Sequence, residues 1–384
     1  MITSYSKRGL AALMLAHCAG MIDLVALPVW VGTLVAHYHF DARQAGLLAS
    51  LFLGGAVLAS AMLAPRFDPE TARWKAAIGF ALSALLFTVA AQTHHYLLLA
   101  LLHTVCGITT GLSLSVTHGT IARGSNPHRG FALVGIALGV FAILFLGSAP
   151  PLVAHLGGST LFYLFAGVMA VGALASALAF PRAETDGLPR VSIVRQPVPR
   201  QVWYGIAGIA CMGLVQSMTF SFLERVGSDR GFGLQAVTGV LIALGFVNLL
   251  PAPLAALLEK RLPARSVLMA GPLVQALLVL VIMSSARFAP YAAAASVFAA
   301  VMIFTHTFAF GLMARLDRSG RAMAATPAML MTGAAIGPIL GGTLVQGWGY
   351  GSLGPVALTL GLTASFCFSR LPRGAAVQPQ EALA

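Results

Sequence analysis

Residues 9–36 read GLAALMLAHCAGMIDLVALPVWVGTLVA, and Asp23 is the only charged side chain among them. About 20 helical residues span the hydrocarbon core of a bilayer, so this stretch is long enough to cross one. Lys7 and Arg8 precede it, as basic residues precede a secretory signal, but no small-residue cleavage site follows the apolar run. The stretch therefore predicts a retained transmembrane helix near the start of the chain.

The same kind of apolar run recurs along the whole chain. Of its 384 residues 58% are hydrophobic and only 9% are charged, whereas soluble domains carry roughly 25% charged residues. The runs are too long for transmembrane strands and lack their alternation. We therefore predict an all-α membrane protein, embedded in a lipid bilayer, with twelve transmembrane helices at 9–36, 44–65, 74–92, 96–121, 131–154, 158–180, 201–223, 233–257, 266–285, 288–314, 322–346 and 352–370.

The charged residues lie almost wholly between these runs, and they predict an orientation. The net charge is +12, but no basic stripe lies beside aromatic stacking residues, so nucleic acid is not expected as a partner. With a cytoplasmic N-terminus, nineteen Lys and Arg residues fall on the cytoplasmic side and four on the other. This bias predicts that both termini are cytoplasmic. We expect the membrane to be a bacterial inner membrane.

The chain also resembles itself at an offset of 192 or 193 residues. Gly20 and Asp23 then fall on Gly213 and Gln216, and Arg123 falls on Arg315. Such an internal repeat predicts two six-helix bundles related by a pseudo-two-fold axis along the membrane normal. The bundles are expected at 1–182 and 201–384, with a polar, proline-containing cytoplasmic linker at 183–200.

The string GAAIGPILGG at 333–342, the twelve runs and the basic central loop together resemble the major facilitator superfamily over essentially the whole chain. The resemblance implies the fold of that family and secondary transport of a small molecule by a monomer without a cofactor. Glycines four residues apart let helices approach closely, and a proline frees a backbone carbonyl. The residues to which the resemblance gives a role in gating or helix packing are Gly333, Gly337, Pro338, Gly341 and Gly342.

Two other family motifs are altered here. Where the family has GxxxDRxGRR between the second and third helices, this chain keeps Arg66 but has Pro65 in place of the Asp. Arg66 is a gating candidate, with a simple topological charge as the alternative. The Arg-x-x-x-Gly pattern of the fourth helix appears as His103 to Gly107, followed by Gly111. A permanent cation has thus become a titratable group, and both glycines are packing candidates.

Asp23 is the only carboxylate well inside a predicted span. Intramembrane carboxylates are expensive and are usually functional, so we predict that Asp23 couples transport to protons, with His103 as the second candidate. Ala16, Gly20, Leu27 and Trp30 share its helical face, which suits the lining of a cavity. The alternatives are a protonated Asp23 held by backbone groups and histidines that only pack.

Several polar residues of the spans are candidates for substrate contact. Gln216 is the repeat partner of Asp23, with interhelical hydrogen bonding as the alternative. Trp30, Asn248 and His306 are further candidates. The four cysteines and the histidines show no metal-ligand spacing, so no metal is expected.

The absence of nucleotide-binding and nucleophile motifs predicts a transporter driven by an ion gradient rather than an enzyme. A proton-coupled exporter of drugs or metabolites is slightly favoured. A proton symporter that takes up a small organic metabolite is the first alternative, and a transporter-like sensor or membrane enzyme is the second.

Overall fold

The fold was obtained as a computed structural model, which describes residues 6–63, 67–124, 126–181, 199–316 and 326–372. Within these ranges twelve helical segments have the length and composition to cross a membrane. Every one overlaps a run expected from the sequence, so the predicted all-α fold class is confirmed. Of the predicted linker at 183–200 only residues 199 and 200 are among the described residues, and Arg66 lies outside them.

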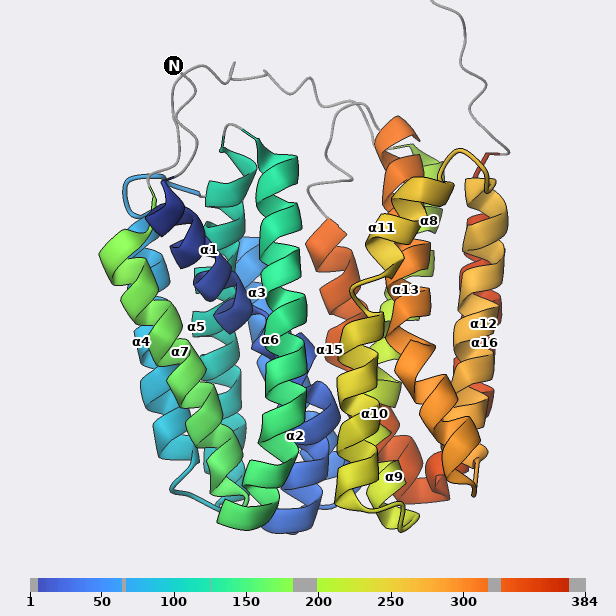
Figure 1. Ribbon diagram of the computed structural model, residues 1–384, viewed down its shortest axis with the longest axis horizontal. Helices are drawn as coiled ribbons and strands as arrows, with labels where there is room; N and C mark the ends of the chain where they lie inside the picture. Colours follow the sequence, from blue (N-terminus) through green and yellow to red (C-terminus); the bar gives the residue numbers. More distant parts are fainter. Residues whose placement is uncertain (1–5, 64–66, 125, 182–198, 317–325, 373–384) are drawn as a thin grey trace, which may run out of the picture.

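Seven helices make up the first half of the chain, which lies on the left of Figure 1. The first span is divided into two helices, and each of the next five is one helix. In chain order they are α1 (Lys7–Gly20), α2 (Ile22–Tyr38), α3 (Ala42–Leu63), α4 (Ala72–Ala90), α5 (Tyr96–Ala122), α6 (Pro127–Leu156) and α7 (Ser159–Ala179).

The second half is more interrupted. Its first two spans are each divided, and its last begins with a short 3₁₀ turn. The elements are α8 (Arg200–Phe220), α9 (Leu223–Asp229), α10 (Leu234–Val247), α11 (Pro251–Leu258), α12 (Ala264–Ser284), α13 (Phe288–Leu316), α15 (Thr326–Trp348), η2 (Tyr350–Ser352) and α16 (Leu353–Ser369).

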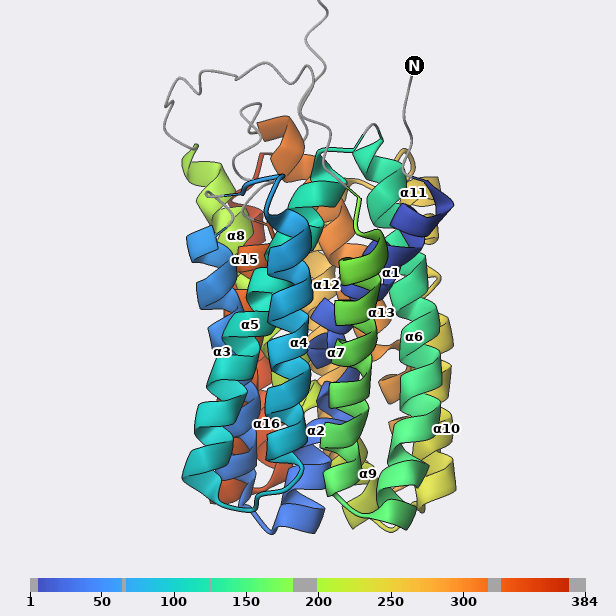
Figure 2. The same ribbon diagram turned by 90° about the vertical axis from the view of Figure 1, so that its left-hand side faces the viewer.

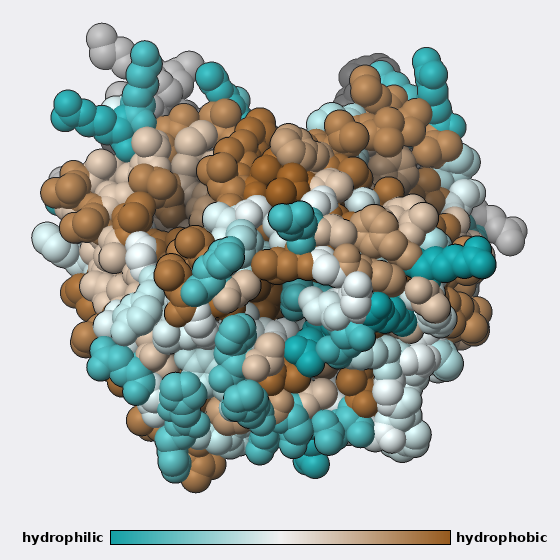
Figure 3. Space-filling model, turned by 60° about the horizontal axis from the view of Figure 1, so that its bottom comes forward, coloured by the Kyte–Doolittle hydropathy of each residue, from teal (hydrophilic) through white to brown (hydrophobic). Residues whose placement is uncertain are grey.

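All spans run side by side along one direction (Figures 1 and 2). We call one end the basic end, where α1, α6 and α8 begin and α5 and α16 finish. It carries Lys7, Arg123, Arg129, Arg200 and Arg370. The opposite end is called the far end. Figure 3 brings the far end toward the viewer and shows hydrophilic side chains gathered on it, with hydrophobic side chains around the flanks.

Some helix pairs pack within the first half, and others join the two halves of the chain. In the first half α3 packs on α5, α4 packs on α5 and α7, and α1 packs on α7. Contacts between the halves join α3 to α15, α6 to α10, and α2 to α9. We call the surface formed by these three pairs the seam. Large exposed hydrophobic side chains such as Leu97, Leu178 and Leu257 lie on the outside of the bundle, as expected for a lipid-facing surface.

Candidate functional site

The first span is broken close to its middle. α1 ends at Gly20 and α2 begins at Ile22, and the backbone N–H of Met21 between them donates to the carbonyl oxygen of His17 at 3.0 Å. Asp23 is therefore in the first turn of α2, where the helix dipole favours a negative charge by about 0.3–1 kcal/mol, which is less than the burial of an unpaired carboxylate costs. Pro28 lies inside α2 without ending it, so it is not the cause of this break.

The Asp23 side chain is only 4% exposed. Its Oδ1 atom is buried and has no hydrogen-bond partner among the described residues, and the one ion pair recorded there, Arg225 with Asp229, lies elsewhere. Burying an ionised carboxylate without a cation is costly, and protonation removes that cost. This environment therefore suits a carboxyl group that binds a proton in this conformation.

The helical face that Asp23 shares with Trp30 lies toward the first half, because the Trp30 ring packs there against Phe52 and His103. A Cβ atom at Gly20, one turn earlier, would meet the Leu114 side chain of α5, and Trp30, two turns later, is fully buried. Gly32 is nine residues after Asp23, which at 100° per residue places it on the opposite side of α2. That side contacts Glu224 of α9 across the seam. The sequence predicted a cavity lining for the Asp23 face, whereas here the face is packed inside the first six spans.

Trp30 and His103, two candidate residues, belong to one aromatic cluster. The Trp30 ring lies 5.5 Å from that of His103, 5.2 Å from Phe52 and 4.8 Å from Phe165. His103 Nδ1 lies 2.7 Å from the carbonyl oxygen of Leu99, which makes Nδ1 the donor. Trp30 Nε1 and His103 Nε2 are then buried without a hydrogen-bond partner among the residues that the structure describes. One unused donor and one unused acceptor thus sit on neighbouring rings.

The candidates of the second half form a polar set of their own. Gln275 of α12 donates from Nε2 to Gln216 Oε1 at 3.1 Å and to the carbonyl oxygen of Met212 at 3.3 Å. Gln216 thus makes the interhelical bond that the sequence left as an alternative to substrate contact. Asn248 lies at the break between α10 and α11. Its Oδ1 atom, like His306 Nδ1, has no hydrogen-bond partner within the part of the chain that the structure describes. No local sequence pattern predicts the contact of Gln275 with Gln216, because the two residues are 59 positions apart.

The glycine-proline string of α15 serves two interfaces. A Cβ atom at Gly333 or Gly337 would collide with α8, against Ala210 and Met218, within the second half. A Cβ atom at Gly342 would instead collide with the backbone of Ala42 on α3, across the seam. Gly341 faces the side chains of Met218 and Phe222.

Hydrogen bonds close the same part of the seam. The backbone N–H of Ile339, directly after Pro338, donates to Ser50 Oγ on α3 at 3.0 Å. The N–H of Ala42 donates to Gln346 Oε1 at 3.2 Å. Elsewhere Gly107 and Gly111 of α5 lie against the α3 backbone at Phe52 and Ala56, inside the first half.

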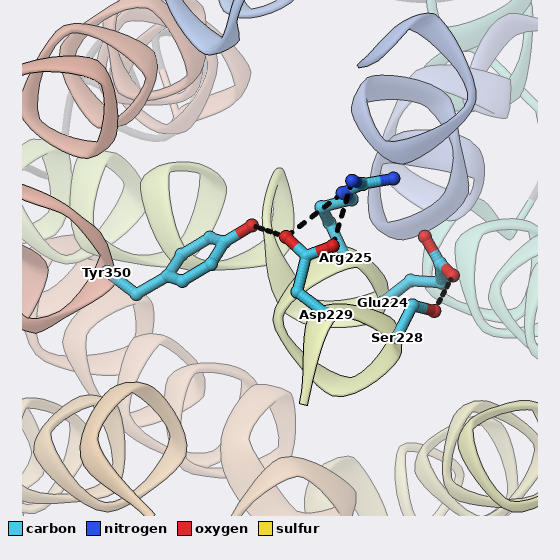
Figure 4. A network of polar contacts seen from close by, with 5 residues as sticks. All are labelled: Glu224, Arg225, Ser228, Asp229 and Tyr350. Atoms are coloured by element: carbon cyan, nitrogen blue, oxygen red, sulfur yellow. Dashed lines mark hydrogen bonds and ion pairs between the residues drawn. The ribbon is translucent and has the colours of Figure 1, made fainter. Parts of the chain in front are cut away.

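A charged network lies at the far end beside the seam (Figure 4). Arg225 pairs with Asp229 at 2.8 Å, and the Tyr350 hydroxyl donates to Asp229 Oδ2 at 2.6 Å. Ser228 donates to Glu224 Oε1 at 2.5 Å. These bonds tie α9 to η2, so the Glu224 carboxylate that faces Gly32 is held by the second half.

Comparison with known proteins agrees with this arrangement of helices. The sequence profile of the Major Facilitator Superfamily matches residues 12–316. The chain belongs to the Major Facilitator Superfamily. It is therefore an integral membrane protein and a transporter of small solutes. No curated protein matches the chain by sequence.

Solved structures of this superfamily share its fold. The nucleoside transporter NupG aligns with 95% of this chain and 99% of its own, at 15% identity and a TM-score of 0.75. The D-xylose-proton symporter aligns with 96% and 99%, at 16% identity and a TM-score of 0.74. A bacterial homolog of the human lysosomal transporter Spinster aligns with 94% and 93%, at 14% identity and a TM-score of 0.64.

Proposed function

We propose that this superfamily member couples solute movement to protons by alternating access, and that Asp23 is the group that binds the proton. The observation that carries the proposal is the buried Asp23 carboxyl group, which has an unpartnered oxygen and no cation beside it. Its place at the break between α1 and α2 supports the same assignment. Discontinuous helices near the middle of the bilayer are where transporters place coupling-ion sites.

The proposed mechanism uses two access states. A carboxyl group closed off from water favours its protonated form, and one that reaches water releases its proton more readily. Asp23 would therefore carry a proton while packed side chains close it off, as here, and exchange the proton when water reaches it. His103 is the second candidate for this role, although no charged group faces it in the aromatic cluster and its Nδ1 is bound to the backbone.

Alternating access needs two bodies that move against each other, and we propose the bundles 1–182 and 201–384. Recurring helix pairs support this division. The contacts of α4 with α5 and α7 match those of α12 with α13 and α16, and the contact of α1 with α7 matches that of α8 with α16. The basic end is proposed to be cytoplasmic because of the positive-inside bias.

The substrate is proposed to be a small organic solute that is neutral or cationic, since no Lys or Arg lies in the middle of a span. Gln216, Asn248, His306 and Trp30 are its proposed contacts. Export of a drug or metabolite is the direction that we propose first. Uptake by symport is the second candidate, because one structure with the same fold is a D-xylose-proton symporter.

The test begins with a ligand screen on the purified protein. Sugars, nucleosides and lipophilic cations are compared for their effect on the melting temperature, since a ligand of the native state raises it. The stabilising compound is then followed in proteoliposomes loaded with a pH-sensitive dye, under a proton gradient imposed in either direction. The gradient that drives accumulation distinguishes export from uptake.

Asp23→Asn keeps the shape of the side chain and removes its titration. We expect this variant to lose gradient-driven accumulation and the accompanying proton flux, while exchange of labelled for unlabelled substrate continues. Asp41→Asn is the matched control, because Asp41 is exposed and caps a helix by accepting from Gln44 N–H at 2.7 Å, which Asn also does well. If Asp23→Asn carries protons with substrate at the wild-type ratio, Asp23 is not the coupling group.

A further inference from the structure

Two histidines that are 101 residues apart in sequence meet inside the first half. His17 Nδ1 of α1 lies 3.0 Å from His118 Nε2 of α5, and the ring centroids are 5.1 Å apart. His17 is only 7% exposed, and the Phe131 ring of α6 covers His118 at 5.7 Å. We call these two residues the histidine pair. Its environment is closed on several sides by packed helices.

The histidine pair lies between Asp23 and the basic end. His17 is in the last turn of α1 and Asp23 is in the first turn of α2, so only the break at Met21 separates their turns. Six residues correspond to a rise of about 9 Å along a regular helix, so proton transfer between the histidine pair and Asp23 would use one or two water molecules in the state in which water reaches Asp23. His118 is one turn before α5 ends at Ala122, at the basic end. The pair therefore marks the direct path from Asp23 to that end of the bundle.

The hydrogen bond between the two rings fixes how many protons the pair binds. Two neutral imidazoles form one N–H···N bond, with one nitrogen as donor and the other as acceptor. One added proton gives an imidazolium cation, whose N–H then donates to the neutral ring through the contact of His17 Nδ1 with His118 Nε2. A second added proton would place two cations in contact in a buried site, which is unfavourable. The pair is thus suited to accept one proton and not two.

Other charged groups near the pair leave this behaviour intact. On the helices packed against α1, the charged and titratable residues nearest to this level are Asp23 on α2, Arg73 and Lys75 on α4, Arg123 on α5, Arg129 on α6 and Tyr163 on α7. Arg73 binds the carbonyl oxygen of Ala177, and Arg123 binds that of Gly119 and covers the Phe67 ring. Both guanidinium groups are therefore already held at the basic end.

We propose that His17 and His118 act as one proton-accepting unit that passes protons between Asp23 and the basic end. This inference rests on the proposed role of Asp23, because a relay needs a group to serve. It differs from the role of His103, whose Nδ1 is bound to its own helix backbone rather than to a second titratable group. In this role the pair holds the proton and passes it on.

The first experiment counts protons. Purified full-length protein is titrated between about pH 8 and pH 4, and the uptake of wild type is compared with that of His17→Gln, His118→Gln and the double variant, since Gln keeps a hydrogen-bonding side chain without titrating over this range. Each single variant should bind as many protons as wild type, because the remaining imidazole still accepts the one proton that the pair holds, and the double variant should bind one fewer. His155→Gln, at an exposed histidine outside the pair, is the control for the substitution itself. A loss of two protons in the double variant, or of none, overturns the proposal.

The second experiment follows Asp23 directly. After a rapid drop in pH, time-resolved infrared spectroscopy records the carboxylic acid band that is missing in Asp23→Asn. We expect the band to appear at least about tenfold more slowly in His118→Gln and in His17→Gln, and at the wild-type rate in His155→Gln. Equal rates in all proteins overturn the relay alone. A wild-type protein in which Asp23 shows no such band at any pH overturns the proposed function as well.

Discussion

Gly342 and Gly337 belong to the same helix and the same motif, yet replacing them should have different effects. An alanine Cβ at Gly342 would lie 2.9 Å from the Ala42 carbonyl carbon and 3.0 Å from the Cα atom of Arg43, both on α3 across the seam. At Gly337 it would lie 2.6 Å from Met218 N and 2.8 Å from the Leu214 carbonyl oxygen, both on α8 in the same half. Carbon atoms pack at about 3.5–4.0 Å, so the helices must part by about 0.5–1 Å at either site.

Overpacking of this size costs about 1–3 kcal/mol. At Gly337 the strain persists in every state in which the second half is folded, so Gly337→Ala should lower the melting temperature. At Gly342 the strain disappears whenever the far end of the seam opens. Gly342→Ala should therefore shift the balance between conformations by about 5- to 150-fold toward the opened seam.

Ser50 reports on the seam because its hydroxyl accepts from Ile339 N–H there and it is 8% exposed. In a variant whose four native cysteines are replaced, Ser50→Cys is labelled with a membrane-impermeant maleimide. The labelling rate should rise at least about fivefold with Gly342→Ala and stay unchanged with Gly337→Ala. If both alanine variants lower the melting temperature alike and leave the labelling rate unchanged, the seam does not open at this site.

Three further outcomes are expected. Gln275→Leu leaves Gln216 Oε1 buried without its 3.1 Å partner, so the unfolding free energy should fall by about 1–3 kcal/mol, and Gln216→Leu in the same chain should restore part of the melting temperature. Tyr350→Phe removes the hydrogen bond to Asp229 at the far end. Because the ion pair of Asp229 with Arg225 is partly exposed, the unfolding free energy, measured by thermal melting, should fall by less than about 1 kcal/mol. At the basic end, hydrogen bonds from the Thr71 hydroxyl and then from the Glu70 N–H hold the pKa of Asp68 below its usual range. The stability that these bonds add is present above the ordinary pKa of Asp and is lost as the pH falls through the lowered pKa. Thr71→Val should therefore raise the Asp68 pKa in a carboxyl NMR titration.

The spans were predictable because apolar length is a local property of the sequence. The runs expected at 74–92 and 352–370, for example, correspond to Ala72–Ala90 and Tyr350–Ser369. The breaks at Met21, at Ser221 to Phe222 and at Asn248 to Leu250 were missed because hydrophobicity continues through them. Proline was an unreliable signal, since α2, α12 and α15 continue through Pro28, Pro272 and Pro338.

The residue types of the candidate site could be chosen from the sequence, but their pairings could not. An acid alone in a long apolar run is visible in the sequence, and Asp23 is therefore a candidate from the sequence alone. The bond between His17 and His118, and that between Gln216 and Gln275, join residues 101 and 59 positions apart. No local pattern encodes such a distance, because it depends on which helices become neighbours.

The two halves carry different kinds of side chain at positions that the sequence repeat pairs, and this difference supports separate roles for the two halves. In the first half, Asp23 and the histidine pair are side chains that can gain and lose protons. In the second half, the repeat partner of Asp23 is Gln216, which is bonded to Gln275, and neither amide titrates. Amides donate and accept without changing charge, so the Gln216 pair suits recognition of a neutral polar solute. Under the proposed mechanism, a proton bound in the first half would act on the solute through the seam rather than by direct contact. The strength of coupling would accordingly depend on Gly32, Gly46 and Gly342, where the backbones or side chains of the two halves touch.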